Sequence, residues 1–268
     1  MRVSNMKINA VYREKKKINF PKSLVAMLII LLVWVIITSM KLVDPIFIPG
    51  PLNLLDSLLR MKTTLLEATL RSAGMAIAGF GLGSLLGLSM GLLMAYSKTF
   101  METLGPIFDF TRPVPIFALI PLFLLWFGPR AITQIMFIAL GVSVLLGVTT
   151  YEAIRNIPVV YIRAAFNLGA SRKRVYRTII IPCIFPHIIG AIRIAAAASW
   201  GLDVASEFMG AQVGLGYNMI IQVIYLNTAG IIVIVIIFSI LAIGMDLTIK
   251  KVESYVTRWT ERAEMMHI

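Results

Sequence analysis

The sequence predicts an all-α integral membrane protein with about six transmembrane helices. Of its 268 residues, 59% are hydrophobic and only 14% are charged, and the mean hydropathy is +0.88. A water-soluble domain of this size cannot bury so much apolar surface, which argues against a soluble globule. The apolar residues also gather in runs of about 20, the length at which a helix crosses a hydrocarbon core of ~30 Å.

Polar or basic segments separate six candidate spans. The third contains Pro113, Pro115 and Pro121, and membrane helices tolerate such breaks where a neighbour or a cavity satisfies the freed backbone groups. The first follows a basic segment, as a signal peptide would, but no small-residue cleavage pattern follows it, so we expect it to be retained. The six spans are residues 22–40, 75–96, 108–127, 131–149, 183–203 and 229–249.

The distribution of lysine and arginine predicts the orientation. Both termini and the loop 150–182 are basic, whereas residues 204–228 contain neither residue type. Segment 41–71 is an exception, because its four basic residues are only partly balanced by acidic ones. The positive-inside rule places both termini in the cytoplasm. The predicted parts are a basic cytoplasmic tail (1–21), a transmembrane domain (22–249) and a cytoplasmic amphipathic tail (250–268).

Two amphipathic segments flank the spans. Apolar residues recur every three or four positions after Asn53, which predicts a separate helix on the outer membrane surface with Asn53 as its N-cap. Near the C-terminus, Val252, Tyr255, Val256 and Trp259 form one apolar face, which predicts a helix lying along the cytoplasmic interface.

A glycine recurs every fourth residue in the second span, at Gly79, Gly83, Gly87 and Gly91. This spacing stacks the glycines on one helix face and lets another backbone approach closely. We expect tight helix packing there, against either the same chain or a second copy.

The basic loop 150–182 has the pattern of a helix, a turn and a second helix. Pro158 suits the first turn of a helix over 158–168, and Gly169 suits the left-handed position after it. Ser171 is placed to cap a second helix over 172–181. The first turn of that second helix is strongly basic, which opposes the helix dipole, so a reason other than local helix stability favours these residues.

Three interpretations of this loop compete. It is a solvated positive-inside loop, a nucleic-acid reader or a docking element for a cytoplasmic partner. Attachment to two spans would obstruct docking in a DNA groove, so we expect no nucleic-acid partner. Ala164, Ala165, Leu168 and Gly169 give a small face for close approach, and the basic residues would steer an acidic partner.

The loop also resembles a known pattern. Ala164-Ala165, three residues, Gly169, nine residues, Ile179, one residue and Ile181-Pro182 resemble the cytoplasmic loop signature of ABC importer permeases, E-A-A-x3-G-x9-I-x-L-P, with Arg163 where the signature has Glu. Three further segments are similar to the nitrate/sulfonate/taurine/bicarbonate group of those permeases, in the family's order. They are residues 69–95, 104–128 and 201–217, and the resemblance covers roughly 45–250.

This resemblance implies a type I ABC importer permease in a bacterial inner membrane. Two permease chains form a homodimer, a cytoplasmic ABC ATPase dimer binds ATP-Mg, and an extracytoplasmic solute-binding protein delivers the solute. The helix over 158–170 would couple the permease to the ATPase. The ATPase-coupling residues that it implies are Arg163, Ala164, Ala165, Leu168, Gly169, Ala170 and Ser171.

The residues independently support a permease chain that leaves ATP hydrolysis to a partner. A nucleotide hydrolase needs a phosphate-binding loop such as G-x4-G-K-[ST], and the chain contains no Gly-Lys pair. The only cysteine, Cys183, and the two distant histidines, His187 and His267, offer no metal-ligand spacing. We therefore expect neither an enzyme nor a cofactor in this chain.

Ionisable residues within spans are candidates for function, and here they are Asp109, Arg193, Asp203 and Glu207. A direct Arg193–Asp203 pair is not expected, because about ten residues of helix separate them. Asp203 and Glu207 are four residues apart and share a helix face, where they are either solvated at the outer mouth or held by another helix. For Glu207, gating and structural hydrogen bonding are both open, and the resemblance, which places a Glu near the outer gate, favours gating.

The predicted pathway also includes an external glycine-rich segment and the proline-rich span. Closely spaced glycines form either a loop that folds back into a cavity or an ordinary turn. For an anionic solute, Arg112, Arg130 and Arg193 are candidate cations. The residues predicted to line or gate the pathway are Asp203, Glu207, Gly210, Gly214, Gly216, Pro113, Pro115, Phe117 and Arg193.

The leading interpretation is a homodimeric permease subunit for a small anionic solute. An ion-coupled secondary transporter that uses Asp109, Asp203 and Glu207 is the alternative, and a non-transporting membrane scaffold is a third class. The sequence leaves the identity of the solute open.

Overall fold

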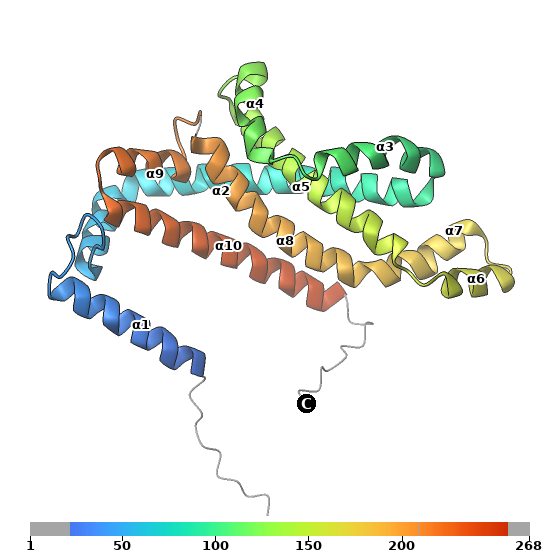
Figure 1. Cartoon of the computed structure of the whole chain (residues 1–268), viewed down its shortest axis with the longest axis horizontal. Coiled ribbons are helices and arrows are strands. Elements are labelled where there is room, and N and C mark those ends of the chain that lie inside the picture. Colours follow the sequence, from blue (N-terminus) through green and yellow to red (C-terminus); the bar gives the residue numbers. More distant parts are fainter. Residues whose placement is uncertain (1–21, 209, 257–268) are drawn as a thin grey trace, which may run out of the picture.

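The structure is a computed structural model that describes residues 22–208 and 210–256 (Figure 1). These residues form helices and connecting turns without any strand, which confirms the predicted all-α class. The helices are α1 (Lys22–Ser39), α2 (Pro51–Tyr96), α3 (Lys98–Thr111), α4 (Ile120–Phe127), α5 (Ala131–Arg155), α6 (Val159–Asn167), α7 (Arg172–Val175), α8 (Ile181–Phe208), α9 (Leu215–Ile224) and α10 (Thr228–Val256).

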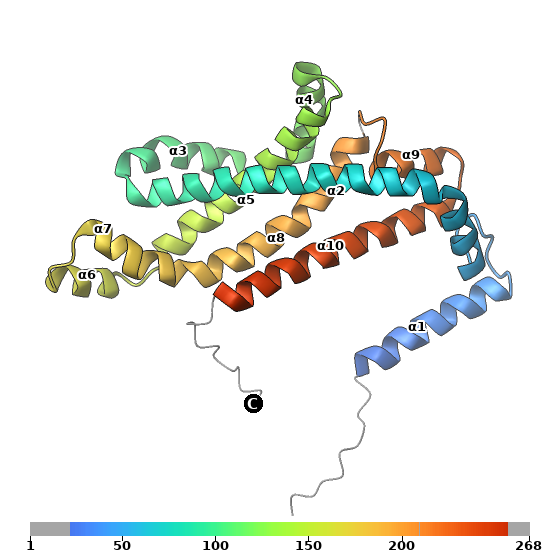
Figure 2. The same cartoon turned by 180° about the vertical axis from the view of Figure 1, so that it is seen from behind.

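The long helices α2, α8 and α10 lie side by side in a bundle (Figures 1 and 2). The bundle has an α9 end, where α9 and the α1–α2 connection lie, and an α6 end, where α6, α7 and α3 lie. Helix α1 lies apart from the bundle and is apolar all round, with exposed side chains on every face. A helix of this composition suits a lipid environment.

Five of the six predicted spans have a counterpart that is long and apolar enough to cross a membrane, whereas the first corresponds to α1, whose apolar part Leu24–Ser39 is shorter. Four continuous helical segments are long and apolar enough to cross a membrane, and α3 with residues 116–127 forms a fifth span that is bent by 94°. The bend falls inside the predicted third span, beside Pro113 and Pro115. The four continuous segments are Pro51–Tyr96, Ala131–Arg155, Arg172–Phe208 and Thr228–Tyr255.

The separate surface helix predicted after Asn53 is wrong, because α2 runs without a break from Pro51 to Tyr96. The N-cap is Gly50 and Pro51 occupies the first turn, where its missing N–H costs little. The buried face of α2 continues at every third or fourth residue through this region, so nothing in the packing ends the helix.

Two other predicted boundaries are also absent. The helix predicted over 172–181 is not separate, because α7 continues through a π-helical turn (Tyr176–Ile180) into α8, past Pro182. At the C-terminus, α10 continues to Val256 instead of giving way to an interfacial helix. Trp259, on the predicted apolar face, lies outside the described residues.

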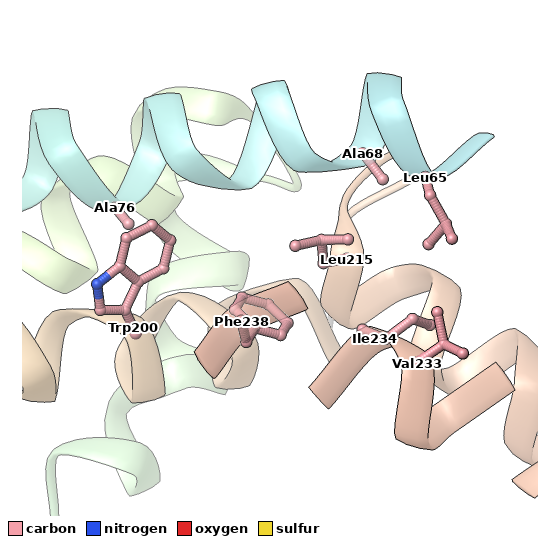
Figure 3. Close-up of a cluster of buried hydrophobic side chains, with 8 residues drawn as sticks. All are labelled: Leu65, Ala68, Ala76, Trp200, Leu215, Val233, Ile234 and Phe238. Atoms are coloured by element: carbon pink, nitrogen blue, oxygen red, sulfur yellow. The ribbon is translucent and has the colours of Figure 1, made fainter. Parts of the chain in front are cut away.

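Two apolar clusters hold the bundle together. The first lies between α2, α8, α9 and α10 (Figure 3), where the Trp200 and Phe238 rings meet edge to face with centroids 6.3 Å apart. The second joins α4, α5 and α8 around the fully buried Ile138 and Leu146. Members of the first cluster are Leu65, Ala68, Ala76, Trp200, Leu215, Val233, Ile234 and Phe238.

The glycine stripe of α2 lies against α5 of the same chain. A Cβ atom on Gly83 would lie 2.6 Å from the carbonyl oxygen of Ala139, so only glycine allows this approach. Each successive glycine, four residues further along α2, faces a residue about four positions further along α5. The two helices therefore run in the same direction. The opposing residues are Gly79 with Ile138, Gly83 with Val142, Gly87 with Leu146 and Gly91 with Thr150.

Candidate functional site

Glu207 joins three helices at the α9 end of the bundle. Its side chain is 1% exposed. The Ser72 hydroxyl of α2 donates a hydrogen bond to Oε1 at 2.6 Å, and the backbone N–H of Gly216 donates to Oε2 at 2.5 Å. The Ser72 oxygen also accepts the N–H of Leu215 at 2.8 Å. The Glu207 carboxylate and the Ser72 hydroxyl thus satisfy the free N–H groups at the start of α9, where a negative charge is favourable.

This carboxylate explains Gly214 in the α8–α9 turn (residues 210–214) and Gly216 in the first turn of α9. Gly214 has φ = 150°, and a Cβ atom there would overlap the Glu207 carboxylate. A Cβ atom on Gly216 would lie 3.0 Å from Glu207 Oε2. Both glycines are buried, so the turn folds back against the bundle instead of extending from it. Gly210 packs against Leu124 of α4.

Asp203 lies one helical turn before Glu207 and is fully buried. Neither of its carboxylate oxygens has a hydrogen-bond partner among the described residues. The alternative in which both carboxylates are solvated at an outer mouth is therefore wrong, since both side chains are inside the bundle. The other predicted alternative holds for Glu207, which α2 and α9 bind.

Arg193 does not pair with Asp203, as expected, but with α10. Its Nε and Nη2 atoms bind the two Asp246 oxygens at 2.7 and 2.9 Å, and Glu253 lies 3.8 Å from Nη1. Such bidentate pairs fix geometry as well as charge. Arg112 at the end of α3 binds Glu152 of α5 at 2.7 Å. Both arginines thus join neighbouring helices.

The proline-rich residues lie on the surface of the single chain. Pro113 and Pro115 form the bend between α3 and residues 116–127, and Phe117 is 56% exposed. Helix α4, which follows, projects from the bundle (Figures 1 and 2) and leaves Trp126 64% exposed. Asp109 is exposed on α3. Among the described residues, these side chains are exposed and do not enclose a cavity.

A groove of ≈ 590 Å³ opens between α2, residues 129–131 and the α8–α9 turn. Arg71 and Arg130 line it and form no ion pair with any residue of the described ranges, and Glu67 and Gln212 also line it. The sequence reasoning named Arg130 but missed Arg71. Arg71 is the last charged residue before the uncharged remainder of α2, and this position at a span boundary is the signal that could have found it.

Helix α6 lies at the far end of the molecule without a buried side chain. Leu168 is 88% exposed, and the apolar Val159, Val160, Tyr161 and Phe166 are also exposed. Arg163 and Ala164 are exposed as well, while Ala165 and Ala170 are partly buried. The part of the chain that the structure describes therefore leaves an apolar helix face uncovered.

The turn after α6 has the predicted capping geometry. Gly169 has φ = 78°, its N–H donates to Phe166 O at 2.9 Å, and the N–H of Ala170 donates to Ala165 O at 3.0 Å. These two bonds form a Schellman motif, which favours glycine at this position. The Ser171 hydroxyl accepts the N–H of Arg174 at 3.3 Å. Only the start of α6 differs, because Pro158 is its N-cap and not part of its first turn.

The sequence of this chain is similar to those of known transport proteins. The model of a family described as "Binding-protein-dependent transport system inner membrane component" matches residues 83–258. The taurine transport system permease protein TauC of Escherichia coli (strain K12) is 29% identical over 238 residues, which cover 86% of each chain. A putative aliphatic sulfonates transport permease protein, SsuC of Bacillus subtilis (strain 168), is 28% identical over 93% of this chain and 91% of that one.

A solved structure shares the fold. The MetNI methionine ABC transporter, in a structure of its inward facing conformations, superposes with a TM-score of 0.59 at 18% identity. The match covers 72% of this chain and 98% of the other. At this identity the likeness shows the arrangement of helices alone.

Proposed function

This chain belongs to the family of binding-protein-dependent transport system inner membrane components, and from that premise we propose that α6 docks on a separate ATPase and that the solute is a small anion. The chain is a multi-pass permease subunit of an ABC importer and falls in the nitrate/sulfonate/taurine group. Family membership implies an ATPase and a solute-binding protein as partners. Docking, solute and assembly are the parts that we propose.

The uncovered face of α6 is the observation that carries the docking proposal. A helix of nine residues is marginal by itself in water. The Schellman motif and the Ser171 cap nevertheless hold its end in a defined shape, with Leu168 pointing away from the chain. A fixed apolar face that no described residue covers supports a groove on another protein as its binding site.

Substitution of Leu168 by Asp tests this docking. We expect Leu168→Asp to lower the amount of ATPase that co-purifies with the permease by about tenfold, since a central apolar contact is replaced by a charge. Phe47→Asp is the matched control, because Phe47 is 74% exposed at the opposite end of the molecule. Equal recovery of the ATPase with both variants would refute the docking proposal.

The groove beside the α8–α9 turn supports an anionic solute. Guanidinium groups bind sulfonate-like and carboxylate anions through paired donors, and neither Arg71 nor Arg130 forms an ion pair within residues 22–208 and 210–256. Glu67 lines the same groove and lowers its net charge without cancelling it. The relatives are named for taurine and aliphatic sulfonates, which carry the matching group.

Uptake into proteoliposomes, with saturating binding protein and ATP, tests the solute class. We expect Arg130→Gln and Arg71→Gln each to lower the rate of uptake of a sulfonate by about tenfold or more, the effect of one lost charged hydrogen bond. Arg60→Gln is the control, because Arg60 lies on the same helix but is paired with Asp56 at 2.9 Å. Unchanged uptake in the two groove variants would exclude this groove as the anion site.

Asp203 favours a second candidate function, an ion-coupled transporter. Its buried carboxylate has no partner among the described residues, as expected of an ion-carrying group. This candidate requires uptake without ATP that a protonophore abolishes and that Asp203→Asn removes. Uptake that depends strictly on ATP and survives the protonophore would exclude it.

A second copy of the chain completes the proposed pathway. Support comes from α4, which projects from the bundle with Leu125 79% exposed and Trp126 64% exposed. In a homodimer such a helix would be covered by the partner, and Pro113, Pro115 and Phe117 beside it would face the shared pathway. Crosslinking between copies through a cysteine at Leu125, in a Cys183→Ser background, tests this arrangement.

A further inference from the structure

We call the segment from α6 to α7 (residues 159–175) the docking loop. Three side chains join it to the end of α2, and we call them the Tyr96 cluster: Tyr96, Arg172 and Tyr176. The Arg172 guanidinium lies over the Tyr96 ring, 4.9 Å from its centroid, and donates a hydrogen bond to the Tyr96 carbonyl. The Tyr176 ring meets the Tyr96 ring edge to face at 5.3 Å. The Tyr176 hydroxyl donates to the carbonyl of Leu92 at 2.7 Å.

The cluster accounts for a basic residue that its own helix does not favour. Arg172 begins α7, where a positive charge opposes the helix dipole. The same guanidinium lies at the C-terminal end of α2, where a positive charge is favourable and the last carbonyls lack helical partners. Arg172 therefore stabilises the contact between two elements at the expense of the shorter one.

A π-helical turn begins within this cluster, at Tyr176, and leads into α8. It spans Tyr176–Ile180, between α7 and the long helix that begins at Ile181. Such turns interrupt the regular hydrogen-bond ladder and are frequent at functional sites. The docking loop is thus fixed to α2 by side chains, while an irregular turn connects it to α8.

Helix α2 extends from this cluster to the turn at the α9 end (Figure 2). Leu92 and Ser72 lie about 30 Å apart along a continuous helix with a rise of 1.5 Å per residue. Ser72 binds Glu207 and the N–H of Leu215 at that end. Between the two points the glycine stripe packs α2 against α5, so the helix cannot move there independently of α5.

From these contacts we infer that the Tyr96 cluster transmits to α2 the movement that a docked ATPase imposes on α6. Helix α2 then carries this movement to the α8–α9 turn. Tyr96, Arg172 and Tyr176 are positioning residues and touch neither nucleotide nor solute. The inference rests on the proposed docking of α6. It goes beyond that proposal by naming the element that receives the movement.

The test is the number of solute molecules taken up per ATP hydrolysed by the complete transporter in proteoliposomes. Tyr176→Phe keeps the ring and removes only the hydroxyl that binds Leu92. Arg172→Lys keeps the charge and removes the planar group that stacks on Tyr96. We expect each variant to keep the wild-type amount of bound ATPase and to lower the uptake per ATP about fivefold, the size of one net hydrogen bond.

Lys173→Gln is the matched control, because Lys173 lies in the same turn and is exposed outside the cluster. Its uptake per ATP should equal that of the wild type. A merely structural role for the cluster would lower the amount of assembled transporter, while each assembled complex kept its normal ratio. An unchanged ratio in Tyr176→Phe and Arg172→Lys would overturn the inference.

The role of α2 has its own test, a double-mutant cycle between Tyr176→Phe and Ser72→Ala. Sites this far apart without shared partners normally behave additively. We expect a non-additive effect on uptake per ATP, because one rigid helix connects the two contacts. Additive effects would refute transmission through α2.

Failure of this inference and failure of the docking proposal give different results. If Leu168→Asp releases the ATPase while the cluster variants keep the normal ratio, docking stands and the transmission inference is wrong. If Leu168→Asp leaves the ATPase bound, the docking proposal is wrong.

Discussion

Glu207 shows how one side chain can determine the path of a whole turn. Its carboxylate fits against the backbone of Gly214 and Gly216, where a Cβ atom would overlap it at Gly214 and meet it tightly at Gly216. Ser72 completes the arrangement by donating to Glu207 and accepting from Leu215. A gating role would use the same contacts, since opening the turn would require these bonds to break together.

Removal of the Ser72 hydroxyl should destabilise the protein. Ser72→Ala leaves the Leu215 N–H and one Glu207 oxygen without partners, which should lower the free energy of unfolding by about 1–3 kcal/mol. Thermal unfolding in detergent measures this effect. Ser84→Ala is the control on the same helix, because the buried Ser84 hydroxyl has no partner among the described residues. Equal losses in both variants would contradict the role of Ser72.

Local chemistry predicted some of these residues and could not predict others. Gly169 and Ser171 were predictable because a helix end is decided by a few neighbouring residues. Ser72 was missed because its partners lie 135 and 143 residues away in the chain. Glu207 was singled out by its charge, yet its burial and partners depend on the tertiary fold.

Among the helices, the contact between α2 and α5 depends on the glycine stripe. Opposing residues advance in step along both helices, so the two backbones stay close over about three turns. Small residues allow this approach, and in a membrane the resulting van der Waals contact is a main source of helix association. The pair therefore forms the rigid part of the bundle.

A single methyl group should separate these two helices. Gly83→Ala places a Cβ atom 2.6 Å from the backbone oxygen of Ala139, which cannot move without moving α5. Overpacking of this kind costs about 1–3 kcal/mol, which should appear as a lower Tm in detergent. Gly81→Ala on the same helix meets nothing within 4 Å and should leave Tm unchanged or raise it. A stable Gly83→Ala variant would show that the contact is loose.

The errors in the predicted elements share a cause. Three predicted boundaries do not exist, after the helix starting at Asn53, at Pro182 and at the end of α10. An amphipathic segment and an apolar span have the same helical period, so a change in polarity along the chain does not require a break. Only packing shows that the helix continues. The bend beside Pro113 was predictable, because proline removes a backbone donor.

At the scale of the whole molecule, the two ends of the bundle carry different chemistry. The α6 end carries an uncovered apolar helix and a basic loop, and the α9 end carries the groove lined by Arg71 and Arg130. The charge distribution predicted two such sides from the sequence. Which helices meet across the bundle depended on contacts that no local pattern encodes.

The sidedness of these ends can be measured by thiol labelling in a Cys183→Ser background. We expect a membrane-impermeant maleimide to label Gln212→Cys in intact cells, and Leu168→Cys only after permeabilisation, because the positive-inside rule places the basic loop in the cytoplasm. Both positions are exposed in the single chain, so in cells that express the permease without its partners access depends on the membrane alone. The reverse labelling pattern would contradict the predicted orientation.

The length of α2 has a consequence for how the protein meets its surroundings. Its 46 residues have a contour length of about 69 Å, roughly twice the hydrocarbon thickness, and the first turns bend away from the rest of the helix (Figure 2). All its charged residues precede Ser72, so the uncharged second half suits the bilayer core and the charged first half suits the membrane boundary. That first half packs against α9 and α10 through Leu65 and Ala68. A protein that binds at this boundary would therefore contact the same helix that crosses the bilayer.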